Sequence, residues 1–403
     1  MDEKNYKCRN LVRSIVTTGI ISGGAIFTQN VMANGITKAL ESGKPVLDVR
    51  IRAEIVDQTP KDDKATALTA RTRIGYMSDK YLGLKGYFEF ENITAMADDY
   101  NSITNGKTKY PVIADPEGSE VNQAFISFTG VKGLLAKAGR QRIILDNARF
   151  VGNVGWRQNE QTYDAALLNT TAIKGLSANY AFVDQINGIT GGASKTDTHL
   201  LNVSYKGLPN AKITAYAYMI DMETGTDNKT LGASVSGKLP IGSEIKMIYS
   251  GEFAQMSDYA DNDSSESANY YALELGAKLK QATIKLGYEV LGGDGTTSFS
   301  TPLATKHKFN GWADMFLGTP GDGLVDTYIT AAGKVSGIKL LATYHMFSSD
   351  NGGDDYGSEI DLLAAKKFGK HYSVGIKYAN YMQGDLASKT DTSKLWLWGG
   401  IKF

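Results

Sequence analysis

Apolar and polar side chains alternate with a period of two along most of the chain. In the stretch 46–56, the apolar side chains are Leu47, Val49, Ile51, Ala53 and Ile55, and the charged side chains between them are Asp48, Arg50, Arg52 and Glu54. A period of two places successive side chains on opposite faces of a β-strand. The same alternation recurs at 68–77 and 82–91. These segments are therefore expected to be strands with one apolar and one polar face.

The alternation predicts about eighteen strands, joined by connections that are alternately long and short. The strands are expected to start near residues 46, 65, 81, 120, 133, 160, 175, 196, 210, 229, 243, 267, 281, 324, 337, 356, 370 and 390. Short turns at one end and long loops at the other are typical of transmembrane β-barrels, whose strands need about 9–11 residues to cross a bilayer. We predict one all-β domain over residues 34–403, an antiparallel barrel of eighteen strands with sixteen as the alternative. Its short turns are expected in the periplasm and its longer loops outside the cell.

Soluble all-β folds are the alternative. A propeller would repeat a four-stranded motif at a period of about 40–50 residues, and no such repeat is visible in the sequence. A two-sheet sandwich would bury much less apolar surface than eighteen strands supply. A closed barrel also leaves no unpaired edge strand. The pattern therefore favours the barrel.

The N-terminus is typical of a secretory signal peptide. Four basic residues, Lys4, Lys7, Arg9 and Arg13, precede a short apolar stretch at 14–27, and small residues lead up to Ala33. That order indicates a basic region, a hydrophobic region and a cleavage site. The apolar stretch is too short for a membrane-spanning helix. We predict that residues 1–33 are removed on export, together with Cys8, the only cysteine.

The C-terminal strand resembles the recognition strand of bacterial outer-membrane proteins. One face is expected to carry Leu395, Leu397, Gly399, Ile401 and Phe403. A terminal aromatic on such a face is read by the barrel assembly machinery in that class of proteins, although an ordinary last strand is the alternative. Together with the signal peptide it predicts a protein of the bacterial outer membrane, whose partners are outer-membrane lipids and the assembly machinery.

Composition excludes several other classes. The 43 basic and 43 acidic residues give no net charge, which argues against a nucleic-acid binder. The four histidines are scattered without metal-ligand spacing or a nucleophile motif, so no catalytic residue, metal or cofactor is expected. The 44 glycines suit a chain with many tight turns.

Arginine is confined to the first part of the mature chain. The eight residues are Arg50, Arg52, Arg71, Arg73, Arg140, Arg142, Arg149 and Arg157. Six form i, i+2 pairs, so both members of each pair are expected on one strand face. On the lipid face each would cost about 2–4 kcal/mol, so we place them in the lumen, where Lys85, Glu89 and Glu91 also line the wall. Such a wall would guide anions; alternatively the arginines pair with nearby acids and stiffen it, and both roles can coexist.

Two long loops are candidates for narrowing the channel, namely 97–119 and 292–323. The second carries Trp312, Met315, Phe316 and Leu317, which are too apolar for a freely solvated loop. From the sequence it either folds into the lumen as a plug or packs on the rim.

Three segments together resemble the alginate-export family of outer-membrane porins. They are 139–143 (GRQRI), 150–164 (FVGNVGWRQNEQTYD) and 307–326 (HKFNGWADMFLGTPGDGLVD). The resemblance implies a monomeric barrel of eighteen strands with an arginine-lined conduit. The late strands depart from that pattern because they contain no arginine.

We therefore predict an outer-membrane channel for passive diffusion of small polar solutes. Anions are favoured, with sugar acids or oligosaccharides as examples of the solute. The alternative class is a barrel without a transport function, such as an adhesin, a structural protein or a barrel enzyme.

Overall fold

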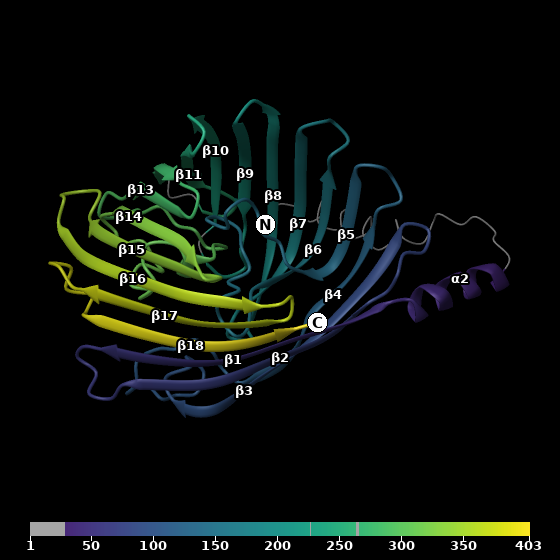
Figure 1. The fold of residues 1–403 in the computed structure, drawn as a ribbon, viewed down its shortest axis with the longest axis horizontal. Coiled ribbons are helices and arrows are strands. Elements are labelled where there is room, and N and C mark those ends of the chain that lie inside the picture. The colour runs from purple at the N-terminus through teal and green to yellow at the C-terminus, as the bar shows by residue number, and fades with distance from the viewer. Residues whose placement is uncertain (1–28, 226, 263–265) are drawn as a thin grey trace.

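Eighteen antiparallel strands close into one barrel in the computed structural model, which describes residues 29–403 except 226 and 263–265 (Figure 1). The first nine strands are β1 (Lys44–Gln58), β2 (Ala65–Met77), β3 (Leu84–Asp99), β4 (Gly118–Phe128), β5 (Leu134–Gln141), β6 (Thr162–Thr170), β7 (Leu176–Asn187), β8 (Ala193–Leu208) and β9 (Ala211–Ile220). The others are β10 (Asn228–Ile241), β11 (Ile245–Asp258), β12 (Ser267–Lys278), β13 (Ala282–Leu291), β14 (Leu324–Val335), β15 (Ile338–Ser348), β16 (Asp355–Phe368), β17 (Tyr372–Met382) and β18 (Thr392–Lys402). Strand β1 pairs with both β2 and β18, which closes the barrel.

The predicted fold class and strand count are confirmed. Every strand begins within three residues of its expected start, because the alternation of side chains stops where the chain leaves the sheet. The sixteen-strand alternative is excluded. The antiparallel order also follows the sequence, since each strand pairs with the next one along the chain.

The outer face of the barrel is an apolar belt. Exposed side chains on this face include Ile74 (59% exposed), Leu273 (61%) and Leu286 (60%). Their neighbours along each strand face inward, so the belt occupies every second position. Side chains this apolar and this exposed suit contact with lipid chains.

Strand β18 shows the two faces clearly. Leu397, Ile401 and Phe403 are exposed on the outer face, whereas Trp396 is fully buried on the inner face. The predicted shared face of Leu395, Leu397, Gly399, Ile401 and Phe403 is therefore the outer one. The Phe403 backbone N–H donates to Leu47 O at 2.8 Å, which joins the last residue to β1.

The two ends of the barrel differ, as the connection lengths predicted. One end carries the short turns, of which the β14–β15 turn is only residues 336–337, together with the C-terminus (Figure 1). The other end carries the long loops, and the longest are 100–117, 142–161 and 292–323. We refer to the short-turn end and the long-loop end below.

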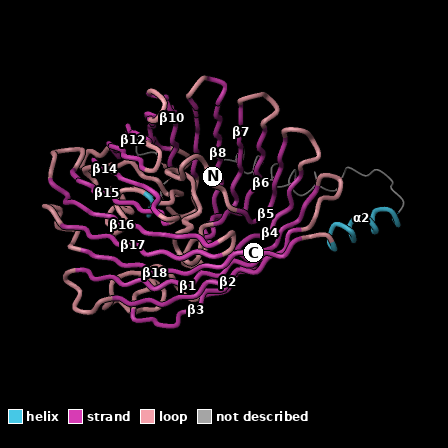
Figure 2. The backbone as a smooth tube through the Cα atoms, in the orientation of Figure 1, coloured by secondary structure: helices cyan, strands magenta, loops and turns pink. Residues whose placement is uncertain are grey.

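The three longest loops fold into the barrel rather than away from it (Figure 2). The interior core combines Phe150 and Phe299 from two of these loops with Tyr216 and Tyr270 from the wall. The Phe150 ring lies 5.2 Å from each of these tyrosine rings, centroid to centroid. The barrel is therefore a filled structure in its long-loop half.

Helix α2 (Gln29–Glu41) precedes β1 at the short-turn end. Most of the predicted signal peptide, residues 1–28 of 1–33, lies outside the described residues. Within the part of the chain that the structure describes, no helix is long and apolar enough to span a membrane.

Candidate permeation pathway

Four of the predicted arginines lie on the inner faces of β1 and β2. Arg50 lies directly opposite Arg71 in the antiparallel register, and like charges in that position repel. The repulsion is offset by acids on the same wall. Arg71 donates to Asp48 at 2.5 Å, and Arg73 pairs with Glu91. This part of the wall is therefore a paired network rather than a free row of cations.

The β5–β6 loop (142–161) covers the arginines of β1. The Arg50 guanidinium donates to the carbonyl oxygens of residues 155, 156 and 157 at 3.2, 3.0 and 2.5 Å, and its Nε donates to Gln158 Oε1 at 2.9 Å. Arg52 is 1% exposed and donates to the Trp156 carbonyl. A guanidinium has five donors in a planar fork, which suits it to hold several carbonyl groups at once. These arginines thus hold a loop against the wall.

The β3–β4 loop (100–117) contributes a buried acid to the same network. Asp115 pairs with Arg52, and its Oδ1 accepts the Gln158 backbone N–H at 2.7 Å. Burial alone would raise the pKa of Asp115, but Arg52 and Arg157 hold it below its usual value. The Asp115 carboxylate therefore stays charged and joins two loops to β1.

The β13–β14 loop (292–323) is held by a second buried acid, Asp314. This carboxylate accepts from Lys394 at 2.8 Å, from Arg157 at 2.9 Å and from His307 Nδ1 at 2.6 Å. Burial alone would raise the pKa of Asp314, but its three donors hold it well below the usual range. Arg157 also reaches Glu54 at 3.3 Å, so one cluster connects β1, β18 and two loops.

His307 completes this cluster as a neutral side chain. Burial lowers the pKa of His307 to about 3. Of its charged neighbours, Asp314 opposes this shift and Lys377 adds to it. Its Nδ1–H donates to Asp314, and its Nε2 accepts from Lys377 Nζ at 2.7 Å. The ring stacks on Trp156 with centroids 5.2 Å apart and planes 5° apart. The two loops are therefore packed on each other as well as on the wall.

The apolar segment of the β13–β14 loop folds inward. Phe316 packs against Phe347 with ring centroids 4.6 Å apart, and it also contacts Tyr356 and Tyr381. Trp312 lies 3.6 Å from Lys377 Nζ, measured to the ring centroid. Leu317 remains 44% exposed. Of the two alternatives left by the sequence, the structure shows a loop inside the barrel that leaves open space on either side.

Of the remaining predicted pore residues, Arg142, Arg149 and Lys85 lie inside the barrel, whereas Arg140 does not face the lumen. Arg142 pairs with Glu89 at 2.9 Å, and Arg149 is 2% exposed and pairs with Glu289 at 2.8 Å. These residues and Lys85 lie on the inside, but both arginines are ion-paired. The pair expected from Arg140 and Arg142 requires correction, because β5 ends at Gln141 and the i, i+2 rule does not extend past a strand end.

Arg140 itself does not point into the lumen. Its guanidinium makes a bidentate contact with the Asp164 carboxylate: Nε donates to Oδ1 at 2.8 Å and Nη2 donates to Oδ2 at 3.1 Å. Asp164 lies on the face of β6 opposite Tyr163 and Ala165, both of which belong to the interior core. Of the six arginines expected to form a lumenal ladder, four lie on the inner faces of β1 and β2 and Arg142 lies inside on the β5–β6 loop, all engaged by loops or acids, whereas Arg140 does not face the lumen.

Lysines line the opposite wall, and the sequence interpretation did not include them among the pore residues. Each strand from β9 to β16 places one inward lysine near its short-turn end; we call this set the lysine collar, and it consists of Lys212, Lys238, Lys246, Lys278, Lys285, Lys334, Lys339 and Lys367. Lys212 and Lys285 pair with Asp146 and Glu274. The other six are exposed and form no ion pair within the described chain. The signal was present in the sequence as one lysine per strand at alternating positions.

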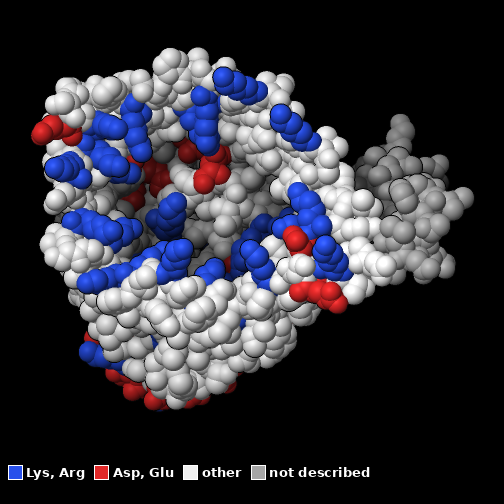
Figure 3. Space-filling view, turned by 45° about the vertical axis from the view of Figure 1, so that its right-hand side comes forward, with Lys and Arg blue, Asp and Glu red and all other residues white. Residues whose placement is uncertain are grey.

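Part of the collar borders open space. A cavity of about 810 Å³ is lined by residues of β9–β16, including Lys238 and Lys339. In the space-filling view basic side chains ring a hollow, and acidic side chains lie deeper in it (Figure 3). A second cavity, of about 590 Å³, is lined by Arg157, Lys389 and Lys394 together with apolar side chains of the long loops. Loop segment 306–315 contributes to both cavities and lies between them.

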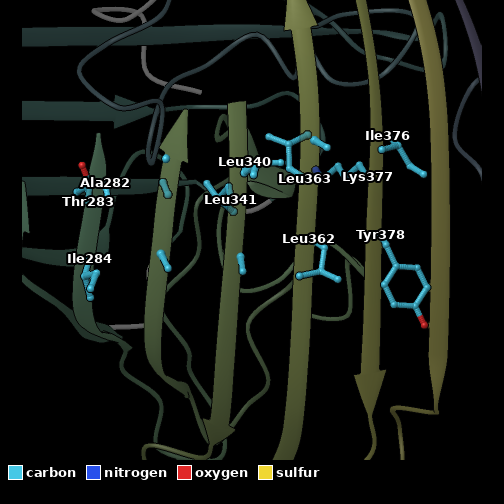
Figure 4. A pocket seen from close by; sticks show the side chains of 15 residues that line it. Ala282, Thr283, Ile284, Leu340, Leu341, Leu362, Leu363, Ile376, Lys377 and Tyr378 are labelled. Carbon is cyan, nitrogen blue, oxygen red and sulfur yellow. The ribbon is translucent and has the colours of Figure 1, made fainter. Parts of the chain in front are cut away.

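A third depression lies on the outside of the barrel. It is an apolar groove of about 670 Å³ across β13–β17, flanked by Ile284, Leu340, Leu362 and Ile376 (Figure 4). These four side chains are 41–48% exposed and belong to the outer belt. The groove lies on the outer face of the wall, and it shares Leu341 and Leu363 with the interior cavity of about 810 Å³ on the other face.

No group of three or more metal-ligating side chains is present among the described residues. The sequence matches no protein-family model and no curated protein.

The fold is that of solved outer-membrane channels. Pseudomonas aeruginosa OccK9 (OpdG) is 13% identical and aligns over 91% of this chain and 100% of its own, with a TM-score of 0.72. Pseudomonas aeruginosa OpdK, solved with vanillate, is 13% identical over 90% and 99%, also with a TM-score of 0.72. Acinetobacter baumannii OccAB4 is 11% identical over 89% and 98%, with a TM-score of 0.70. These similarities establish the eighteen-stranded channel fold; the resemblance to the alginate-export family stays a prediction.

Proposed function

We propose that the protein is an outer-membrane channel for passive diffusion of small anionic solutes. The lysine collar carries the proposal, because six of its lysines are exposed without an acidic partner among the described residues, and two of these, Lys238 and Lys339, line the cavity of about 810 Å³. Rings of basic side chains favour anions in pores. The apolar outer belt and the fold shared with Occ and Opd channels support a position in the outer membrane, with the short turns in the periplasm.

The proposed roles of the basic residues differ from the sequence interpretation. The arginines of β1 and β2 fix the constricting loops, and the collar lysines supply the field that a passing solute meets. A path would run from the cavity of about 590 Å³ between the long loops (the long-loop cavity), past loop segment 306–315, and into the cavity of about 810 Å³ that borders the lysine collar. Cations at Arg157, Lys389 and Lys394 line its first part, so basic groups occur on both sides of that segment.

Small carboxylates are the solute class that this arrangement fits. The long-loop cavity combines cationic side chains with apolar ones such as Val154 and Met315, which suits a charged group on a compact body. The vanillate in the OpdK structure is a solute of this kind. Sugar acids agree with the charge, whereas neutral oligosaccharides would gain nothing from the collar.

Reconstitution into a planar bilayer tests the proposal. In a KCl gradient the reversal potential is expected to show that chloride permeates better than potassium. Cation preference would refute the role of the collar. The absence of conductance would refute the channel and favour a barrel with another function.

A further inference from the structure

We propose that the short-turn rim of the barrel binds the headgroups of anionic phospholipids. The proposal concerns the outside of the barrel and rests on its placement in a membrane, but not on conduction. It is carried by a lysine and an exposed apolar side chain that recur together from turn to turn.

Six of the eight short-turn connections carry an exposed lysine in the turn or at the strand end. These rim lysines are Lys80, Lys132, Lys174, Lys206, Lys280 and Lys370. None of them forms an ion pair with a described residue. Five of them lie in the turns, whereas Lys206 lies within β8, at the irregularity between Tyr205 and Leu208; the collar lysines lie on the inward faces of β9–β16.

Each rim lysine has an exposed apolar side chain within two residues. These partners are Leu82 (63% exposed), Val131 (55%), Ile173 (65%), Leu208 (44%), Leu279 (40%) and Phe368 (48%). Leu82 continues the outward face of β3, where Leu84 and Phe88 are also exposed. The apolar partners thus extend the lipid-facing belt to the edge of the turns.

This pairing matches the chemistry of a phospholipid surface. The apolar side chain gains by leaving water for the acyl boundary, while a lysine on its flexible stem keeps its ammonium at the level of the phosphates. Clustered lysines near a membrane surface are attracted to anionic lipids, and the attraction decays over about 8–10 Å at physiological salt. A zwitterionic headgroup carries a phosphate but no net charge, so it should be held less strongly.

The long-loop end of the barrel differs from the short-turn rim in how its exposed lysines are paired. There, exposed lysines pair with acids, as in Lys64 with Asp57 at 2.7 Å and Lys195 with Asp184 at 2.8 Å. At the short-turn end two turns are exceptions: the β14–β15 turn (336–337) contains no lysine, and in the β10–β11 turn exposed Ile241 is followed by Glu244 instead of a lysine. A lysine introduced at Glu244 should therefore increase the binding of anionic lipid at the β10–β11 turn.

The test compares two variants with the same change in charge. The rim variant replaces the six rim lysines by Gln, and the collar variant replaces Lys238, Lys246, Lys278, Lys334, Lys339 and Lys367 by Gln. Native mass spectrometry then counts phosphatidylglycerol and phosphatidylcholine molecules retained by each barrel from mixed micelles. We expect the rim variant to lose at least threefold of its bound phosphatidylglycerol, and the collar variant to retain it. Equal retention by the two variants, or a greater loss in the collar variant, would overturn the proposal.

Single substitutions keep the proposal testable if the six-fold variant does not fold. Glu244→Lys should increase retained phosphatidylglycerol, whereas Asp62→Lys, with the same charge change in the β1–β2 loop, should not. An equal gain from both would contradict a specific rim. Glycerol 1-phosphate at millimolar concentration should fail to displace the lipid; full displacement would show a phosphate site and overturn the lipid assignment. Bilayer recordings on the same barrels separate the outcomes, because loss of conductance refutes the channel and leaves lipid retention unchanged.

Discussion

Two walls of the same lumen are basic, and they use their charges in different ways. On β1 and β2 the cations are arginines, and Arg52, Arg71 and Arg73 are at most 5% exposed. On β9–β16 they are lysines, and six of the eight are exposed without an acidic partner. The arginine wall lies beneath the inward-folded loops, whereas the lysine wall borders open space.

The difference in side-chain chemistry underlies the proposed division between structural and permeation roles. A guanidinium satisfies several carbonyls and carboxylates together, as Arg50 does across the β5–β6 loop. An ammonium is a compact charge that keeps its hydration and acts through its field. Substitutions on the arginine side should therefore change stability and loop position, and those on the lysine side should change ion preference.

The largest effect is expected at the acid that holds both loops. Asp314→Ala removes the partner of Arg157, Lys394 and His307 and leaves buried charge uncompensated, so we expect a loss of about 3–5 kcal/mol. The freed β13–β14 loop should also raise single-channel conductance and noise. Denaturant unfolding and bilayer recording measure these effects. Asp62→Ala, at an exposed acid of the β1–β2 loop, serves as the control and should change neither; an unchanged midpoint for Asp314→Ala would contradict the role assigned to this carboxylate.

The second-largest expected effect is that the β13–β14 loop is held less firmly inside the barrel at acidic pH. His307 titrates near 6.5 in an unfolded chain, whereas burial lowers its pKa to about 3 in the fold. Between these values the unfolded chain binds a proton that the folded chain does not, so stability falls as the pH drops from 6.5 towards 3. The slope approaches about 1.4 kcal/mol per pH unit from this group. Glu160 adds to the loss below pH 4.5, because burial, which raises its pKa, is outweighed by Arg73 and Arg142, which lower it to about 2.

Limited proteolysis of the β13–β14 loop at pH 7.5 and 4.5 measures this effect. Cleavage should be faster at pH 4.5. His307→Gln should reduce the difference between the two rates, whereas His371→Gln, at an exposed histidine, should leave it intact. Equal cleavage of the native protein at both pH values would show that His307 does not contribute to docking.

A smaller effect is expected from a change that keeps the charge. Arg50→Lys retains the cation but cannot reach the same four acceptors, so we expect about 1.5–3 kcal/mol of destabilisation. The reversal potential should stay the same, because Arg50 is covered by the loop. Thermal unfolding and bilayer recording measure both. A shift in ion preference without loss of stability would reverse the roles assigned to the two walls.

The smallest effect is expected at a paired lysine on the surface. Lys64→Gln breaks an ion pair with Asp57 in which the two side chains are 65% and 49% exposed. Exposed pairs contribute less than about 1 kcal/mol. Neither stability nor selectivity should change measurably; a large loss of stability would contradict the small contribution expected of this exposed pair, and a shift in ion preference would show that Lys64 takes part in permeation.

The barrel was predictable because the period of two is a local property of each strand. Leu47 to Ile55 alternate with charged residues, and this pattern predicted both faces of β1 without any tertiary contact. The length of the turns then fixed which end carries the loops. Even the inward fold of 292–323 had a local sign in Trp312 and Phe316.

The role of the arginines was not predictable, because their partners are distant in sequence. Arg50 contacts carbonyls more than 100 residues away, and a carbonyl has no sequence signature. Arg140 and Arg142 do not share a face because β5 ends at Gln141, and such a boundary is uncertain by a residue or two from sequence. The lysine collar had a pattern in the sequence, but it becomes a ring only when eight strands are aligned in register.

The reversal potential of the collar variant tests the central claim most directly. In a KCl gradient, replacing the six exposed collar lysines by Gln should reduce chloride preference severalfold and leave the unfolding midpoint unchanged. The comparison variant Arg71→Gln with Arg73→Gln, which removes two charges from the arginine wall, should lower the midpoint and keep the chloride preference of the native barrel. The account would be contradicted if the arginine variant lost anion preference while the collar variant kept it.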